Sequence, residues 1–87
     1  MKFIQHAQFK KQLKKLPKGV QGKAVERLGL FMQDQFDPLL NNHKLKHALY
    51  EYRSINVTGD FRIIYRMIGP ETCFLFKIGD HHGLFGL

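Results

Sequence analysis

The spacing of apolar residues divides the chain into a helical first half and a strand-rich second half. After a short segment over 2–5 that fits a strand, apolar residues recur every three or four positions across 6–16 and again across 20–35. This is the spacing of a helix with one buried face. Pro17 and Gly19 separate the two segments, because proline disfavours a helical residue before it. Two helices joined by about three residues are expected to form an antiparallel hairpin.

The second half has the pattern of β-strands. Three segments are rich in β-branched and aromatic residues, a composition that favours pleated strands: 49–57, 61–68 and 72–78. Short glycine-containing turns separate these segments. The polar and basic stretch that precedes them, over 39–48, is predicted to be a loop.

These elements predict an α+β fold in the order β-α-α-β-β-β. An antiparallel sheet would carry the N-terminal helical hairpin on one face. Residues 1–87 are expected to form one domain, because a chain of this length supports one hydrophobic core. The inner face of the second helix is expected to contain Ala24, Val25, Leu28, Phe31, Met32 and Gln35.

The tight turn between the last two strands predicts their register. Paired positions should sum to about 140, which places Arg62 opposite Ile78 and brings Asp60 near Asp80 and His81. The preceding strand is expected to lie beside the same segment. Residues that are far apart in sequence are therefore expected to gather in one polar and basic patch at one end of the sheet.

Charge narrows the classes of function. The net charge is +7 at pH 7, and more than half of the lysines and arginines precede residue 28, where Glu26 is the only acid. Such a chain attracts polyanions or an acidic protein. The single cysteine, Cys73, excludes an internal disulfide and a cysteine-based zinc site. Because no apolar run reaches the roughly 18 residues of a membrane span and the N-terminus lacks a signal-peptide pattern, we expect a cytoplasmic protein.

Histidines in a basic chain make acid–base chemistry on RNA the first reaction to consider, since histidine exchanges protons near neutral pH. His81 and His43 are the expected proton carriers. Arg62 is expected to hold a phosphate, and Asp60 to orient a histidine or act as a base. A further group is expected to bind RNA through charge or base stacking: Lys44, Lys46, Arg53, Phe85 and Phe61.

Neither a metal nor another cofactor is expected. His81 and His82 are adjacent, so their side chains point apart in an extended tail, and the pair His43 and His47 lies in a polar segment without a helical pattern. His82 is therefore interpreted as a bystander. In the alternative without a catalytic role, both tail histidines are exposed residues with no function, and the apolar residues after them pack onto the end of the core.

The same residues form a family pattern. In chain order it consists of His43-Lys44-Leu45, Tyr52-Arg53, Gly59-Asp60-Phe61-Arg62-Ile63-Ile64-Tyr65-Arg66, Ile78-Gly79-Asp80-His81 and Gly83-Leu84-Phe85-Gly86. Over essentially the whole chain, this order resembles the RelE/ParE toxin superfamily, and most of all the YafQ branch of bacterial type II toxin–antitoxin systems. The resemblance implies a toxin that enters the A site of the 70S ribosome and cleaves mRNA without a metal, through attack of the RNA's own 2′-hydroxyl. It also implies a cognate acidic antitoxin, whose complex with the toxin binds operator DNA.

Position by position, the resemblance makes His81 the general acid and His43 the histidine of a His-x-Leu motif. Asp60 matches an aspartate that precedes an aromatic residue, and Phe85 matches the aromatic of the closing motif. Arg62 matches an arginine that RelE-like members use against the scissile phosphate, where YafQ-like members commonly differ.

The chain departs from the YafQ branch at Ser54 and Asn56, where that branch presents an acid and a second histidine. Neither side chain is a good acid or base at neutral pH. Two other functions therefore stay open. One is ParE-like, non-enzymatic binding to DNA gyrase on the same fold, and the other is a catalytically weakened relative that only binds an antitoxin.

Overall fold

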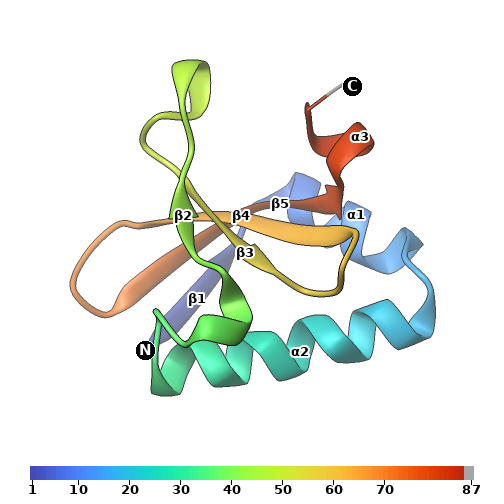
Figure 1. The fold of residues 1–87 in the computed structure, drawn as a ribbon, viewed down its shortest axis with the longest axis horizontal. Helices are drawn as coiled ribbons and strands as arrows, with labels where there is room; N and C mark the ends of the chain where they lie inside the picture. The colour runs from blue at the N-terminus through green and yellow to red at the C-terminus, as the bar shows by residue number, and fades with distance from the viewer. Residues whose placement is uncertain (86–87) are drawn as a thin grey trace.

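The computed structural model of the chain, in which residues 1–85 are described, is built on a five-stranded sheet (Figure 1). In chain order its elements are β1 (Lys2–Gln5), α1 (Ala7–Lys15), α2 (Lys18–Gln33), β2 (His43–Lys44), β3 (Arg53–Asn56), β4 (Phe61–Met67), β5 (Thr72–Asp80) and α3 (His81–Phe85). Short 3₁₀ helices at Pro38–Leu40 and His47–Leu49 flank β2. The strands lie side by side in the order β1-β5-β4-β3-β2.

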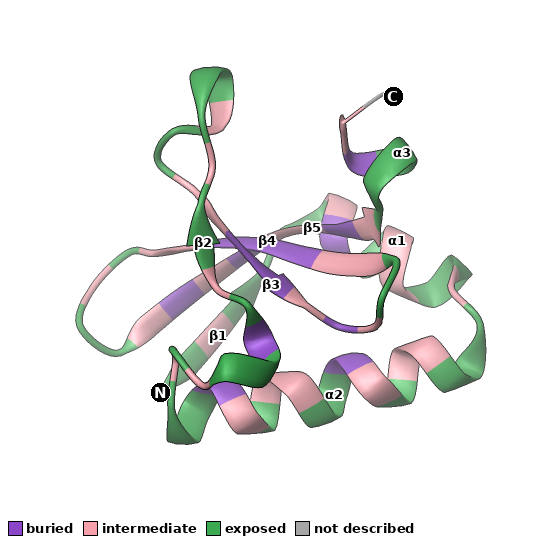
Figure 2. Ribbon diagram, in the orientation of Figure 1, coloured by how far each residue is buried: buried purple, intermediate pink, exposed green. Residues whose placement is uncertain are grey.

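The predicted α+β class and its helical hairpin are confirmed. Phe9 of α1 and Phe31 of α2 share one buried cluster with Ile63 of β4 and Leu75 of β5, so both helices pack on the same face of the sheet. Figure 2 shows the buried residues concentrated on the central strands and at isolated positions of the helices. One strand pair departs from a purely antiparallel sheet, because β1 runs parallel to β5. The long connection through the rest of the chain makes such a pair possible.

The register between β4 and β5 follows the prediction near the turn and departs from it farther away. Tyr65 lies opposite Leu75, but an irregularity between positions 64 and 65 gives β5 one extra residue. Arg62 therefore lies opposite Gly79, and its predicted pairing with Ile78 is wrong. A β-bulge of this kind places two residues opposite one, which a uniform ladder drawn from the turn does not anticipate.

Two segments adopt structures that the sequence pattern did not predict. The expected loop contains β2, in which His43 pairs with Ser54, and a strand of two residues is too short to show an alternating pattern. The C-terminal tail forms α3, where the backbone N–H of Gly83 donates to Asp80 Oδ1 at 2.6 Å. This contact is a helix cap. Gly86, which the family pattern includes, and Leu87 lie outside the described residues.

The inner face of α2 is narrower than predicted. Ala24 and Phe31 are buried, whereas the side chains of Val25 and Met32 are 67% and 51% exposed. A helix that rests on a sheet buries only one stripe of its surface, and these two residues lie beyond it. Cys73 is buried, and its burial raises the pKa of the thiol to about 12.

The face of the sheet opposite α2 is here called the open face. Because side chains alternate along a strand, Ile63 and Tyr65 point toward the helices, while Arg62 and Arg66 of the same strand point to the open face. β2 with the loop that follows it rises on one side of this face, and α3 rises on the other (Figure 1). The open face is therefore the floor between two raised elements. None of the helices among residues 1–85 is long and apolar enough to cross a membrane.

Candidate active site

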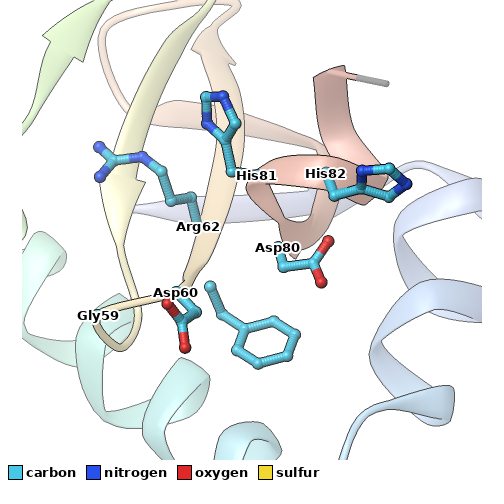
Figure 3. Close-up of a pocket in the computed structure, with 7 residues that line it drawn as sticks. Gly59, Asp60, Arg62, Asp80, His81 and His82 are labelled. Carbon is cyan, nitrogen blue, oxygen red and sulfur yellow. The ribbon is translucent and has the colours of Figure 1, made fainter. Parts of the chain in front are cut away.

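Two adjoining cavities lie at the end of the open face where α3 begins. The first, here called the histidine cavity, has a volume of about 520 Å³ and is lined by His43, Leu45, Arg62, His81 and Phe85. The second, here called the acidic cavity, has a volume of about 470 Å³ and is lined by Gly59, Asp60, Phe61, Arg62, Asp80, His81 and His82 (Figure 3). Arg62 and His81 line both cavities and so stand at their boundary.

Arg62 is held on the open face by groups from three segments. Its Nε donates to Ser54 Oγ and its Nη1 to Asn56 Oδ1, both on the neighbouring strand β3. Its Nη2 donates to the backbone oxygen of Asn41 at 3.2 Å and lies 3.3 Å from His43 Nδ1. Burial lowers the pKa of Arg62 below its ordinary value, but an arginine still keeps its charge at neutral pH. The result is a fixed cation that borders both cavities.

His43 has two alternative partners for one ring nitrogen. Its Nδ1 lies 3.0 Å from the backbone oxygen of Asn41 and 3.3 Å from Arg62 Nη2. A protonated Nδ1 donates to the carbonyl, whereas an unprotonated Nδ1 accepts from the arginine. When Nδ1 carries the proton of a neutral ring, Nε2 has a free lone pair and is able to accept a proton. Asn41 has a φ of 43°, in the left-handed region that asparagine tolerates well.

His81 is positioned by the start of α3 and by an aromatic neighbour. The cap of Asp80 on the backbone of Gly83 fixes the first turn of the helix. The His81 ring centroid lies 4.9 Å from that of Phe85, with 51° between the planes. Figure 3 shows His81 on the side of Arg62 and His82 pointing in a different direction. Two potential proton carriers, His81 and His43, thus line one cavity with a fixed cation.

Comparison with known families matches this chain from residue 3 to residue 85 to the ParE toxin of type II toxin–antitoxin systems, parDE. The chain belongs to this family. The resemblance to the RelE/ParE superfamily that the motifs indicated is thereby confirmed. A comparison with curated protein sequences finds no match.

Solved structures of toxins share the fold of this toxin. YafQ from E. coli strain BL21(DE3) superposes with a TM-score of 0.82 and 22% identity over 97% of each chain. A YoeB/ParE toxin from Agrobacterium tumefaciens gives 0.79 and 18% identity, over 93% of this chain and 99% of that one. The toxin–antitoxin complex RelBE2 from Mycobacterium tuberculosis gives 0.67 and 21%, over 92% and 96%. Since a fold hosts more than one function, the toxin's chemistry has to be argued from its own side chains.

Ser54 and Asn56, where the toxin departs from the YafQ pattern, are the side chains that orient Arg62. Neither residue was predicted to have a role in the site. The sequence could have indicated their position, because the predicted pairing of β3 with β4 brings alternate residues of both strands to one face. The observed register, with Asn56 opposite Arg62 and Ser54 opposite Ile64, has this arrangement.

Asp60 lies at the rim of the acidic cavity of the toxin. Its carboxylate points away from both His81 and the guanidinium of Arg62 (Figure 3). Its backbone N–H donates to Thr58 Oγ1 at 3.3 Å, within the turn between β3 and β4. The structure therefore brings together His81, His43 and Arg62 of the four predicted catalytic residues and leaves Asp60 apart from them.

Two of the aromatic and basic residues predicted to bind RNA lie near the cavities. Phe85 lines the histidine cavity. Phe61 lines the acidic cavity but packs against the buried cluster between sheet and helices. Their predicted roles toward RNA stay predictions.

The remaining three predicted RNA-binding residues lie elsewhere in the toxin. Arg53 is on the helix-covered face, where its Nε donates to Asn42 Oδ1 at 2.7 Å and its guanidinium lies 5.3 Å from the ring centroid of Phe36. Lys44 is paired with Arg53 and so shares that face, and Lys46 is exposed beyond the end of β2. Within residues 1–85, histidine, cysteine, aspartate and glutamate residues form no group of three or more that could hold a metal ion.

Proposed function

We propose that the toxin is a ribosome-dependent endoribonuclease that cleaves mRNA by metal-independent acid–base chemistry and so inhibits translation. The observation that carries the proposal is the histidine cavity, where His43 and His81 flank the fixed cation of Arg62. RNA cleavage needs one group to accept a proton, one to donate a proton and a positive charge at the phosphate. A toxin that only binds a protein has no chemical need for this combination.

The groups of this cavity account for every bond and proton of the cleavage reaction. The 2′-oxygen attacks the adjacent phosphorus, the bond from phosphorus to the 5′-oxygen breaks, and the products are a 2′,3′-cyclic phosphate and a 5′-hydroxyl. His43 accepts the 2′-hydroxyl proton at Nε2 while its Nδ1–H donates to the backbone oxygen of Asn41. His81, in its protonated form, gives a proton to the leaving 5′-oxygen.

Arg62 stabilises the additional negative charge of the pentacoordinate phosphorus. Its contacts to β3 orient it before the substrate binds, so little reorganisation is needed at the moment of reaction. The scissile phosphate belongs in the histidine cavity, because the carboxylates of Asp60 and Asp80 line the other cavity and repel an anion. Phe85 is available there for stacking on a base.

The proposal includes the partners of the toxin. A cognate acidic antitoxin is supported by the net charge of +7, by the family and by the fold shared with RelBE2, which was solved as a toxin–antitoxin complex. Association with the 70S ribosome and its mRNA in the cytoplasm, and operator DNA binding by the antitoxin complex, belong to the same proposal.

A second candidate function is non-enzymatic inhibition of DNA gyrase, which the description of the matching family favours because it names ParE. A third is a catalytically weakened relative that binds an antitoxin, which Ser54 and Asn56 favour because they replace an acid and a histidine of the YafQ pattern. Neither of these functions accounts for the two histidines beside Arg62.

Pulse labelling of protein and DNA synthesis after induction separates the three functions. The ribonuclease function predicts that protein synthesis stops first and that mRNA fragments carry 2′,3′-cyclic phosphate and 5′-hydroxyl ends. Collapse of DNA synthesis alone would establish gyrase as the target and overturn the proposal. Undisturbed growth, combined with binding to the antitoxin, would identify the weakened relative.

A further inference from the structure

A second feature of the open face lies outside both cavities. Four rings and two cations meet there, and they come from the β1–α1 junction, the start of β3, and strands β4 and β5. This group, here called the aromatic cluster, consists of His6, Tyr52, Phe74, Phe76, Arg66 and Lys77. The proposed chemistry uses none of these residues.

The rings form a row across the sheet. Tyr52 and Phe76 stack with centroids 4.8 Å apart and 23° between their planes. Phe76 and Phe74 follow at 6.2 Å and 25°. His6 meets Phe74 and Phe76 edge-on, with centroids 5.8 Å and 5.5 Å away. The bulge of β5 contributes to the row, because Phe76 is its extra residue.

The cations of the cluster are held by ring faces. The guanidinium carbon of Arg66 lies 5.6 Å from the ring centroid of Tyr52 and 6.0 Å from that of Phe74, and Lys77 Nζ lies 5.3 Å from that of Phe76. The ion pair of Arg66 with Glu51 is long, with 4.0 Å between Nη1 and the carboxylate oxygen. Within the described part of the chain, Arg66 Nε is buried without a hydrogen-bond partner. Arg66 is thus ordered mainly by aromatic packing, and its charge is only weakly compensated.

The aromatic cluster lies on the same face of the sheet as Arg62, which lines both cavities. Arg66 and Arg62 lie on the same strand and the same face, four residues apart, which corresponds to about 13 Å along a strand. Tyr52, Phe74 and Phe76 are each only partly buried, and the helical hairpin covers the other face (Figure 1). A strand of RNA that places its phosphate beside Arg62 would therefore reach the cluster by continuing along the open face.

We propose that the aromatic cluster binds single-stranded RNA next to the cleaved phosphate, with bases on its rings and phosphates on Arg66 and Lys77. The inference rests on the proposed function in taking RNA as the substrate. A single strand fits because each nucleotide offers both a base that stacks on an aromatic ring and an anion for a cation. An acidic peptide would use the cations and leave the exposed parts of the rings without a stacking partner.

The test measures binding without cleavage. A fluorescein-labelled 2′-O-methyl oligoadenylate of about 12 nucleotides has no free 2′-hydroxyl, so the toxin cannot cut it. Fluorescence anisotropy at several salt concentrations gives its dissociation constant. We expect Phe76→Leu to weaken binding about fivefold or more, because leucine fills space but does not stack. Arg66→Gln should weaken binding and reduce the slope of log affinity against log salt by about 0.7, the value for one lost phosphate contact.

Matched controls come from the helix-covered side. Phe36 is an exposed phenylalanine with a cation over its ring, so Phe36→Leu makes the same change away from the open face. Arg27 on α2 donates to the backbone oxygen of Val57 at 3.4 Å, and Arg27→Gln is the matched charge control. Both controls should bind the oligonucleotide within about twofold of the wild type. Thermal melts verify that each variant is folded, and Arg66→Lys should recover the salt slope if phosphate contact is the cause.

The outcomes separate this inference from the proposed function. Wild-type affinity and salt slope in both Phe76→Leu and Arg66→Gln would overturn the inference, whether or not the toxin cuts mRNA. The inference would also fail if these variants bound RNA normally and lost affinity for the cognate antitoxin, because the cluster would then be a protein-docking surface. Selective loss of RNA binding supports it, even where ribosome assays find no cleavage and the proposed function fails.

Discussion

The two faces of the sheet carry the same type of residue in opposite roles. Arg53 of β3 and Arg62 of β4 are both half-buried arginines with hydrogen bonds to neighbouring side chains. Arg53 points to the helix-covered face, where Asn42 links it to the hydroxyl of Tyr65 and Phe36 lies against its guanidinium. Arg62 points to the open face and borders two cavities. Strand alternation, and not residue type, thus separates a structural arginine from a candidate catalytic one.

The hydrogen bonds of Arg53 lead into the protein, whereas Arg62 lines a cavity. Asn42 donates to the hydroxyl of Tyr65 at 2.7 Å and accepts from Arg53 at 2.7 Å, so this chain of hydrogen bonds ends inside the protein. Burial raises the pKa of Tyr65, as expected for a phenol closed off from water. Around Arg62, His43 and His81 face a cavity that admits a ligand. Variants on the open face should therefore lose activity, whereas variants on the helix-covered face should lose stability and keep most of the activity.

The largest effect is expected for His81→Ala. If His81 protonates the leaving oxygen, its loss should lower the rate of mRNA cleavage about 10²- to 10⁴-fold and relieve growth arrest. Cleavage of a defined mRNA on purified ribosomes measures the rate. His82→Ala is the matched control, because the neighbouring ring points in a different direction (Figure 3), and it should cut at the wild-type rate. Equal loss in both variants would indicate damage to α3 rather than missing chemistry.

Arg62→Gln and Arg53→Gln test the comparison of the faces directly. Arg62→Gln should slow cleavage about 10²- to 10³-fold, because it removes the charge that stabilises the transition state, and should also lower the free energy of unfolding by about 1 kcal/mol through its lost hydrogen bonds. Arg53→Gln should lower the free energy of unfolding by about 1 kcal/mol through its lost hydrogen bond and keep most of the activity. The reverse result, an active Arg62→Gln and an inactive Arg53→Gln, would contradict the division of roles between the faces.

The sequence predicted most of the fold, whereas the roles of the predicted site residues stay predictions. Long periodic segments and glycine turns were sufficient for the helical hairpin and the last three strands, because local pattern determines these elements. The bulge in β5 and the two-residue strand β2 arise from packing between distant segments and leave no local pattern. Motifs pointed to His81 and Arg62, which the structure places at one cavity, and to Arg53, which it places on the helix-covered face. The alternation that places it on the other face was already available from the predicted pairing of β3 and β4.

A smaller effect is expected from the side chains that hold Arg62. Ser54→Ala and Asn56→Ala each remove one acceptor from the guanidinium. Cleavage should slow roughly tenfold, because Arg62 keeps its charge but loses its fixed orientation, and unfolding should become easier by about 1 kcal/mol. Arg62→Gln combined with Ser54→Ala should be no slower than Arg62→Gln alone, since Ser54 acts through the arginine. Additive losses would show that Ser54 contributes separately.

The smallest effect concerns Cys73 on the helix-covered face. Burial raises the pKa of its thiol to about 12 from an ordinary value of 9.0, so the folded protein keeps a proton that the unfolded chain loses above pH 9. The folded state then binds more protons, and the free energy of unfolding falls as pH rises, by about 1 kcal/mol between pH 9 and pH 10. Urea melts of Cys73→Ala should show a correspondingly flatter dependence over this range. Parallel curves for the two proteins would mean that the thiol ionises freely and that this face is open to water after all.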